Sequence, residues 1–381
     1  MSTAAPSGRR AGSPRLSVAP MMGWTDRAYR RMMRRITRRT LLYTEMITTG
    51  ALLHGDAERF LAHHPEERPL ALQLGGDDPG ALAACARLAQ SAGFTEVNLN
   101  VGCPSDRVQE GRFGACLMAE PARVADCVAA MREASDVAVT VKHRIGIDDL
   151  DAYEDMRRFV DVVAAAGADR FTVHARKAWL RGLSPKQNRT VPPLRYDDVR
   201  RLAAERPDEV IELNGGVRDL DTVLAELRHV PSVMVGRAAF EAPMRWAEAD
   251  VRVFGEPGPA PSLRQVVDAM HEVIEDGLAR GVRLATMVKP LIPLVRGVPG
   301  ARAWRRTLTE EGVRPAAGPE VLQAAARHLP GHVLNAPGGP DAVQGASGTV
   351  SSRTAQPVRT PHREAASPSR RPISSVPSDP R

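Results

Sequence analysis

The sequence predicts a TIM barrel, an α/β fold of eight strand–helix units, followed by a small all-helical domain. Eight apolar runs of about five residues lie between residues 16 and 236, each bounded by turn formers or charges, as buried parallel strands are. Helix-like stretches separate these runs, and eight such units over about 240 residues match the size of a (β/α)8 barrel. No GxGxxG follows any run, which argues against a Rossmann dinucleotide site.

The expected strands are 16–20, 41–45, 70–74, 96–100, 138–142, 170–174, 210–214 and 232–236. Four of the intervening helices have recognisable ends. One opens at Asp78–Pro79 and closes at Gly93, a second opens at Glu120–Pro121, a third spans Leu150–Ala166, and a fourth starts at Asp219. An acidic residue with proline at the start and glycine at the end is the usual asymmetry of helix termini.

Composition divides the chain into four parts. Residues 1–14 are small, polar and basic and are expected to be disordered, and the barrel is expected over 15–257. EPGPAPS at 256–262 is a linker by composition, and the helical spacing after it predicts a domain over 262–330. From 331 to 381 the chain is rich in Pro, Ser, Gly and Arg, and we expect a disordered tail.

The net charge is +7 and the isoelectric point is near 9.7. Such an excess of positive charge favours a polyanionic partner, usually nucleic acid, although an arginine-rich genome gives the same composition. The stretch Arg27–Arg39 is basic, with Arg27, Arg31, Arg34 and Arg38 on one side, and we interpret it as a surface without an assigned role.

Cysteine usage and hydropathy indicate the compartment. None of the four cysteines forms a CxxC pair and no histidine follows at zinc spacing, so no metal site is predicted. The start of the chain lacks the apolar stretch of a signal peptide, and no apolar run approaches the roughly 20 residues of a membrane span. We therefore expect a soluble, cytoplasmic protein with free thiols, and a monomer with no stable protein partner.

The ends of the predicted strands carry the candidate site, because TIM-barrel active sites lie there. Loops after strands seven and eight commonly bind phosphate. Gly215, Gly216 and Gly236 would let backbone N–H groups approach a phosphate, and Arg237 could neutralise it. Glycines that only turn the chain are the alternative, but both loops and an arginine match.

Three more strand-end residues could do chemistry. Lys142 could form a Schiff base or hold negative charge on a reduced flavin, and the residue alone does not decide. His174 could donate a hydrogen bond, act as acid or base, or be structural. Cys103 follows strand four in NVGCPS, and a free thiol, mostly protonated at neutral pH, can donate a proton there.

Several motifs are similar to those of one family. APMMGWTDR, EVNLNVGCPSDRV, HARKAWLRGLSPKQNR, LNGGV and VMVGRAAF, between about Leu16 and Arg306, resemble the tRNA-dihydrouridine synthases, in particular the bacterial A-type subfamily. His143 departs from the pattern, which often has Thr or Cys there, and we expect it to alter the polarity of the site without changing the activity.

The resemblance implies FMN across the barrel mouth, with NADPH, or alternatively NADH, as reductant. The residues implied to bind FMN are Ala19, Pro20, Met21, Gln73, Lys142, His174, Asn214, Gly215, Gly216, Gly236 and Arg237. Cys103 would be the catalytic proton donor, giving a proton to C5 of uracil after hydride reaches C6. The residues implied to contact tRNA are Asn100, Lys186, Arg189, Arg302 and Arg305, and the targets would be uridines 20 and 20a of the D-loop.

Without the resemblance three other functions stand. An FMN oxidoreductase acting on a small molecule would not need the basic helical domain after residue 262. A Schiff-base aldolase using Lys142 would carry no flavin. A non-catalytic RNA-binding module would have no use for a thiol, a lysine and a histidine at a phosphate site.

Overall fold

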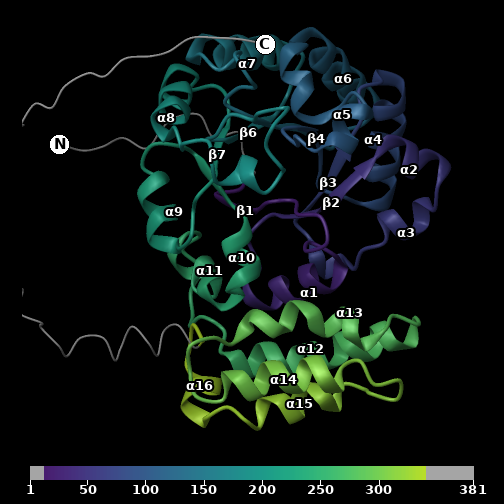
Figure 1. Ribbon diagram of the computed structural model, residues 1–381, viewed down its shortest axis with the longest axis vertical. Helices are drawn as coiled ribbons and strands as arrows, with labels where there is room; N and C mark the ends of the chain where they lie inside the picture. The colour runs from purple at the N-terminus through teal and green to yellow at the C-terminus, as the bar shows by residue number, and fades with distance from the viewer. Residues whose placement is uncertain (1–12, 340–381) are drawn as a thin grey trace, which may run out of the picture.

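The computed structural model describes residues 13–339 and contains the predicted TIM barrel (Figure 1). All pairings are parallel, in the order β1-β8-β7-β6-β5-β4-β3-β2, and a bridge between Ser17 and Leu41 joins β1 to the start of β2. The strands are β1 (Leu16–Val18), β2 (Leu42–Thr48), β3 (Leu70–Gly75), β4 (Glu96–Val101), β5 (Ala138–Arg144), β6 (Arg170–His174), β7 (Ile211–Asn214) and β8 (Ser232–Val235). Each expected run is a strand.

Helices surround the sheet. The α-helices of the barrel are α1 (Arg27–Ile36), α2 (Thr49–His54), α3 (Ala57–Leu61), α4 (Pro79–Ala92), α5 (Asp106–Glu110), α6 (Pro121–Ala134), α7 (Tyr153–Ala165), α8 (Tyr196–Glu205), α9 (Leu220–Glu226), α10 (Arg237–Glu241) and α11 (Ala249–Arg252). Short 3-10 turns are η1 (Pro65–Glu67), η2 (Gly114–Ala119), η3 (Gln187–Arg189) and η4 (Pro243–Trp246). Asp78 and Asp219 cap α4 and α9 as predicted.

The start of α7 differs from the prediction of Leu150–Ala166. The helix begins at Tyr153, because Leu150 is hydrogen-bonded to Ile147 in both directions in a tight turn before it. This turn belongs to the loop that follows β5 at the carboxyl end of the barrel.

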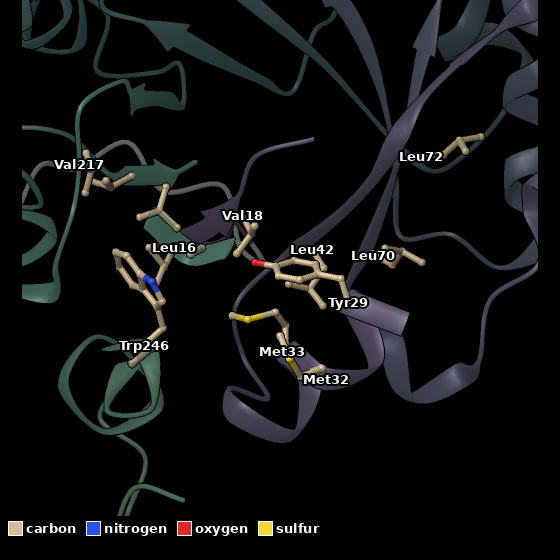
Figure 2. Close-up of a cluster of buried hydrophobic side chains, with 14 of the residues drawn as sticks. Leu16, Val18, Tyr29, Met32, Met33, Leu42, Leu70, Leu72, Val217 and Trp246 are labelled. Carbon is tan, nitrogen blue, oxygen red and sulfur yellow. The ribbon is translucent and has the colours of Figure 1, made fainter. Parts of the chain in front are cut away.

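The apolar core lies between the barrel wall and its helices. Figure 2 shows part of it, where Leu16 and Val18 of β1 meet Tyr29, Met32 and Met33 of α1, all almost completely buried. The inside of the barrel is different, since its apolar residues form only a small separate cluster of Ala19, Leu41, Tyr43, Ala71 and Met234. Most other inward side chains are polar.

The C-terminal helices pack together beside α1, at the bottom of Figure 1. They are α12 (Leu263–Ala279), α13 (Leu284–Val288), η5 (Lys289–Leu294), α14 (Ala301–Glu311), α15 (Glu320–Ala326) and α16 (Gly331–Asn335). Trp304 is fully buried among them and donates its indole N–H to the Leu291 carbonyl at 3.2 Å. Trp304 therefore packs this region.

The disordered tail was expected to begin at residue 331, and this boundary is wrong. Helix α16 packs against α12, burying Val333 and Leu334, and Ser262 forms a β-bridge with Pro337. Two apolar residues suffice here because the partner surface already exists on α12. The remaining expected disorder, at residues 1–12 and 340–381, lies outside the described residues.

Within the basic stretch Arg27–Arg39, helix α1 is largely buried, which corrects the sequence interpretation as a surface, whereas Arg38 after the helix is exposed. Arg31 is 6% exposed and binds Glu66 and, at 2.5 Å, Asp276 of α12. Arg34 is 7% exposed, and its guanidinium donates to carbonyls that include those of Thr37, Thr40 and Glu67. Helix α1 therefore joins the barrel to the C-terminal helices.

In residues 13–339, no helix is both long and apolar enough to cross a membrane.

Candidate active site at the barrel mouth

The strand register brings the predicted site residues to one end of the barrel. Asn100 of β4 pairs with Lys142 of β5, and His174 of β6 pairs with both Arg144 and Asn214. The carboxyl ends of all eight strands open at the same mouth, so residues far apart in the sequence line one space.

Lys142 and His174 both lack a partner at this mouth. Neither side chain makes a hydrogen bond or salt bridge within residues 13–339. Burial, helped by nearby Arg144, lowers the pKa of Lys142 to about 8, so the ammonium form still prevails at neutral pH. Burial and the surrounding cations hold the pKa of His174 well below its usual range, so its imidazole is neutral. The pair offers one cation and one neutral donor to a ligand.

Cys103 lies in a loop that is fixed from several sides. Its backbone N–H donates to Asn100 Oδ1 at 3.0 Å, and its carbonyl accepts the Ala115 N–H at 2.9 Å. Arg144, 3% exposed, donates from Nε to the Gly102 carbonyl at 2.9 Å. The thiol is half-buried and 3.5 Å from Ser105 Oγ. Arg144 thus stabilises the thiol loop, a role that its position at a strand end did not specify.

The loops after β7 and β8 carry the three glycines expected at the phosphate site. Gly215 and Gly216 have φ values of 111° and 74°, and a Cβ on Gly215 would lie 2.6 Å from the His174 ring. Gly236 precedes α10 and has no neighbouring atom within 4 Å of an added Cβ. Half-buried Arg237 follows it, and within residues 13–339 its side chain makes one hydrogen bond, a long one of 3.4 Å to the Arg189 carbonyl. These residues fit a phosphate-bearing ligand such as FMN.

The other expected FMN contacts also lie at the mouth. Ala19 is held by its N–H on the Val235 carbonyl at 2.7 Å. Pro20 and Met21 begin the β1–α1 loop, in which Met21 is tied to Thr25. The next residues of this loop meet the C-terminal helices, since Lys289 donates to the Gly23 carbonyl at 2.7 Å. The side-chain amide of Asn214 on β7 donates to the Met234 carbonyl on β8 at 2.8 Å.

The five expected tRNA contacts fall into three places. Asn100 is 8% exposed inside the mouth. Lys186 and Arg189 are exposed in the β6–α8 loop, where Arg189 lies near Arg237 and Cys103. Arg302 is exposed on α14, and Arg305 reaches back to the Val295 carbonyl at 3.5 Å. Within residues 13–339, no hydrogen bond or salt bridge joins Arg302 or Arg305 to the β6–α8 loop.

His143 does not alter the polarity of the mouth, contrary to the expectation from the sequence. Successive residues of a strand point to opposite faces, so His143 points out of the barrel while Lys142 points in. Its ring packs 4.9 Å from that of Phe159 on α7, and burial lowers its pKa to about 4. It is a neutral packing residue.

Below the mouth lies a buried charge cluster that the sequence analysis missed. Arg170 donates to both oxygens of Glu96 at 2.6 Å, and its Nε lies 3.6 Å from Glu212. Tyr43 donates to Glu96 at 2.9 Å. All four residues are at most 3% exposed. The signal was present, since Glu96 and Arg170 begin apolar runs, but it was interpreted only as flanking charge.

The chain is similar to known proteins over most of its length. Residues 17–329 match the model of the dihydrouridine synthase family, Dus. A tRNA-dihydrouridine(20/20a) synthase of Synechocystis is 55% identical, over 83% of this chain and 95% of its own. Enzymes of the same name from Vibrio vulnificus and Escherichia coli are 53% and 50% identical, over 84% and 82% of this chain and 98% and 91% of theirs. The chain belongs to the dihydrouridine synthase family.

Proposed function

We propose that the protein is an FMN-dependent oxidoreductase that reduces the C5–C6 double bond of uridine in tRNA to dihydrouridine. The observation that carries the proposal is the meeting of a thiol, an unpartnered lysine and a neutral histidine beside the glycines after β7 and β8. The names of the similar enzymes support the D-loop positions 20 and 20a as targets.

Some residues of the mouth would bind FMN, and others would act on the uracil. Gly215, Gly216, Gly236 and Arg237 would hold the phosphate, and Lys142 would supply a cation to the isoalloxazine. Ala19, Pro20, Met21, Gln73, His174 and Asn214 complete the binding site. When bound and reduced by NADPH, FMN supplies the hydride for C6 of the uracil.

Cys103 supplies the proton. Hydride addition at C6 leaves negative charge on C5 and the C4 carbonyl, and the thiol gives its proton to C5 to complete the saturated ring. The carbonyl and N–H of Cys103 are both anchored, so the backbone that carries the thiol is held in place before substrate arrives. Such general acid assistance is worth roughly 10²–10⁴-fold.

The uridine has to leave its stack to reach the mouth, as base-modifying enzymes require. Lys186 and Arg189 on one side, and Arg302 and Arg305 on the other, would bind tRNA phosphates around the extruded base, with Asn100 inside the mouth. We further propose a monomeric, cytoplasmic enzyme that acts without a stable protein partner.

The visible absorption spectrum tests the proposal directly. We expect flavin bands in the purified protein that bleach with NADPH under anaerobic conditions and return on addition of unmodified tRNA, with dihydrouridine at 20 and 20a. Bleaching without reoxidation by tRNA would favour an FMN oxidoreductase with a small-molecule substrate. Absence of flavin even after FMN is added would contradict the proposal and favour an aldolase reaction at Lys142.

A further inference from the structure

A continuous chain of hydrogen bonds runs from the buried Glu96 to the Cys103 loop. Thr140 Oγ1 donates to Glu96 at 2.5 Å, and Asn98 Nδ2 donates to Thr140 Oγ1 at 2.8 Å. Gln73 Nε2 then donates to Asn98 Oδ1 at 2.8 Å, and Asn100 Nδ2 donates to Gln73 Oε1 at 3.0 Å. The chain connects the paired charges below the mouth with the mouth itself.

The last link is made to the thiol loop. Asn100 Oδ1 accepts the backbone N–H groups of Gly102 at 3.1 Å and Cys103 at 3.0 Å. Thr140 and Asn98 are fully buried, Gln73 is 1% exposed and Asn100 is 8% exposed. Buried hydrogen bonds of this kind are rigid, because a broken link leaves a polar group without water to replace its partner.

The two ends of the chain fix its direction. Glu96 is bound through both oxygens by Arg170 and acts as an acceptor, whereas backbone N–H groups can only donate. Each amide between them therefore has one orientation, since rotating any of Asn98, Gln73 or Asn100 by 180° would set like groups against each other. A side-chain amide has no such preference by itself.

We infer that Thr140 and Asn98 are positioning residues for Cys103. Both are buried below the mouth, and they act by fixing the amide orientation of Gln73. Gln73 Oε1 in turn holds the side-chain amide of Asn100, whose Oδ1 accepts the Cys103 N–H. The inference rests on the proposed function, because it assigns the chain to the placement of that function's proton donor.

Substitution of Thr140 tests the inference, with a control of the same chemistry. Thr140→Val removes the hydroxyl without changing shape, so Asn98 loses its acceptor. Thr140→Ser restores the hydroxyl. Thr172→Val is the matched control, since Thr172 is also fully buried on an inward strand position but donates to Glu212, outside the chain. Each variant is purified with FMN and compared with the natural protein.

Three rates are measured: the reduction of the enzyme by NADPH, the anaerobic reoxidation of the NADPH-reduced enzyme by unmodified tRNA, and the alkylation of Cys103 by iodoacetamide, resolved by peptide mass spectrometry. We expect Thr140→Val to slow reoxidation about 10-fold or more, because a misplaced catalytic group loses rate steeply. The rate of Cys103 alkylation is expected to change at least about threefold, whereas the rate of reduction by NADPH should stay within about threefold. Thr140→Ser should restore the rates of reoxidation and alkylation.

The inference is overturned if Thr140→Val behaves like Thr172→Val in both reoxidation by tRNA and alkylation of Cys103. It is also overturned if the rate of reduction by NADPH falls as much as the rate of reoxidation, because the hydrogen-bond chain would then support only the flavin-binding site. Should Thr140→Val fail to fold, Asn98→Asp, which keeps the size of the side chain, carries the same expectations. The alkylation rate needs no turnover, so it judges the inference separately from the proposed function.

Discussion

The mouth of the barrel and the interior beneath it are built from the same strands and the same kinds of side chain. In the interior these side chains bind one another, whereas at the mouth several have no partner in the described part of the protein. On β6, Arg170 at the start of the strand is bound by Glu96, whereas His174 at its end has no hydrogen-bond partner within residues 13–339. On β5, Thr140 is bound to Glu96 and Asn98, whereas Lys142, two residues later, makes no hydrogen bond or salt bridge within the same residues.

The pKa values express the same contrast. Burial by itself lowers the pKa of both basic side chains, but the pKa of Arg170 is raised well above its usual range because Glu96, Tyr43 and Glu212 more than offset burial. No comparable group of anions offsets burial at Lys142, so the pKa of Lys142 falls to about 8. Charges that satisfy one another stabilise the fold, while a charge left without a partner at a mouth is available to a ligand.

The largest expected effect comes from the mouth. Cys103→Ala should lower the rate of tRNA reduction by roughly 10²–10⁴-fold, because the proton donor is lost while the flavin site is untouched. Single-turnover formation of dihydrouridine measures it, with the flavin spectrum confirming bound FMN. Cys116→Ala, a half-buried thiol of η2, is the control and should retain activity. Full turnover by Cys103→Ala would remove the thiol from the mechanism.

A substitution in the interior should act on stability instead. Arg170→Met leaves Glu96 and Glu212 buried without their cation, and breaking a buried ion pair costs about 3–5 kcal/mol. Urea unfolding of the flavin-free protein measures the loss. Arg39→Met, at the exposed pair with Glu256, should cost less than about 1 kcal/mol. Equal losses for the two variants would contradict the structural role of the interior cluster.

The charge of Lys142 should appear as a pH dependence of FMN binding. The ammonium is present below its pKa of about 8 and is lost above it, so FMN affinity should be full near pH 7 and fall toward pH 9. The expected loss is roughly 10-fold, the scale of one hydrogen bond to a charged group. Lys142→Met should bind FMN weakly and with similar affinity at pH 7 and pH 9. The same pH dependence in Lys142→Met would assign the titration to another group.

The smallest effects are expected at the rim, where charges meet solvent and salt. Arg302→Ala or Arg305→Ala should raise the KM for tRNA a few-fold and reduce the slope of log K against log salt by about one per phosphate contact. Reduction by NADPH should not change. Arg306→Ala, an exposed neighbour on α14, is the control. A uniform effect of all three variants would indicate only the net charge of the helix.

The barrel could be predicted because its cues are local. The run at 170–174 is β6 with the same bounds, and Asp78, Pro79 and Gly93 mark the two ends of α4 as expected. The mouth could be predicted as well, since Lys142, His174 and the glycines after β7 lie at the ends of parallel strands. Apolar periodicity, capping and turn chemistry operate within a few residues, so the sequence alone determines them.

The tertiary structure decided what the polar residues meet. The arginines of α1 have the pattern of a solvated face, yet Arg34 is buried because carbonyls from Thr37 to Pro69 converge on its guanidinium. Residues 331–335 are too short and polar to indicate a helix, but α12 offers a surface that covers Val333. The alternation of Glu96, Asn98 and Asn100 is visible in the sequence, whereas their partners Thr140 and Gln73 follow from strand register. Burial and hydrogen-bond partners depend on contacts distant in the chain, and only the folded barrel creates them.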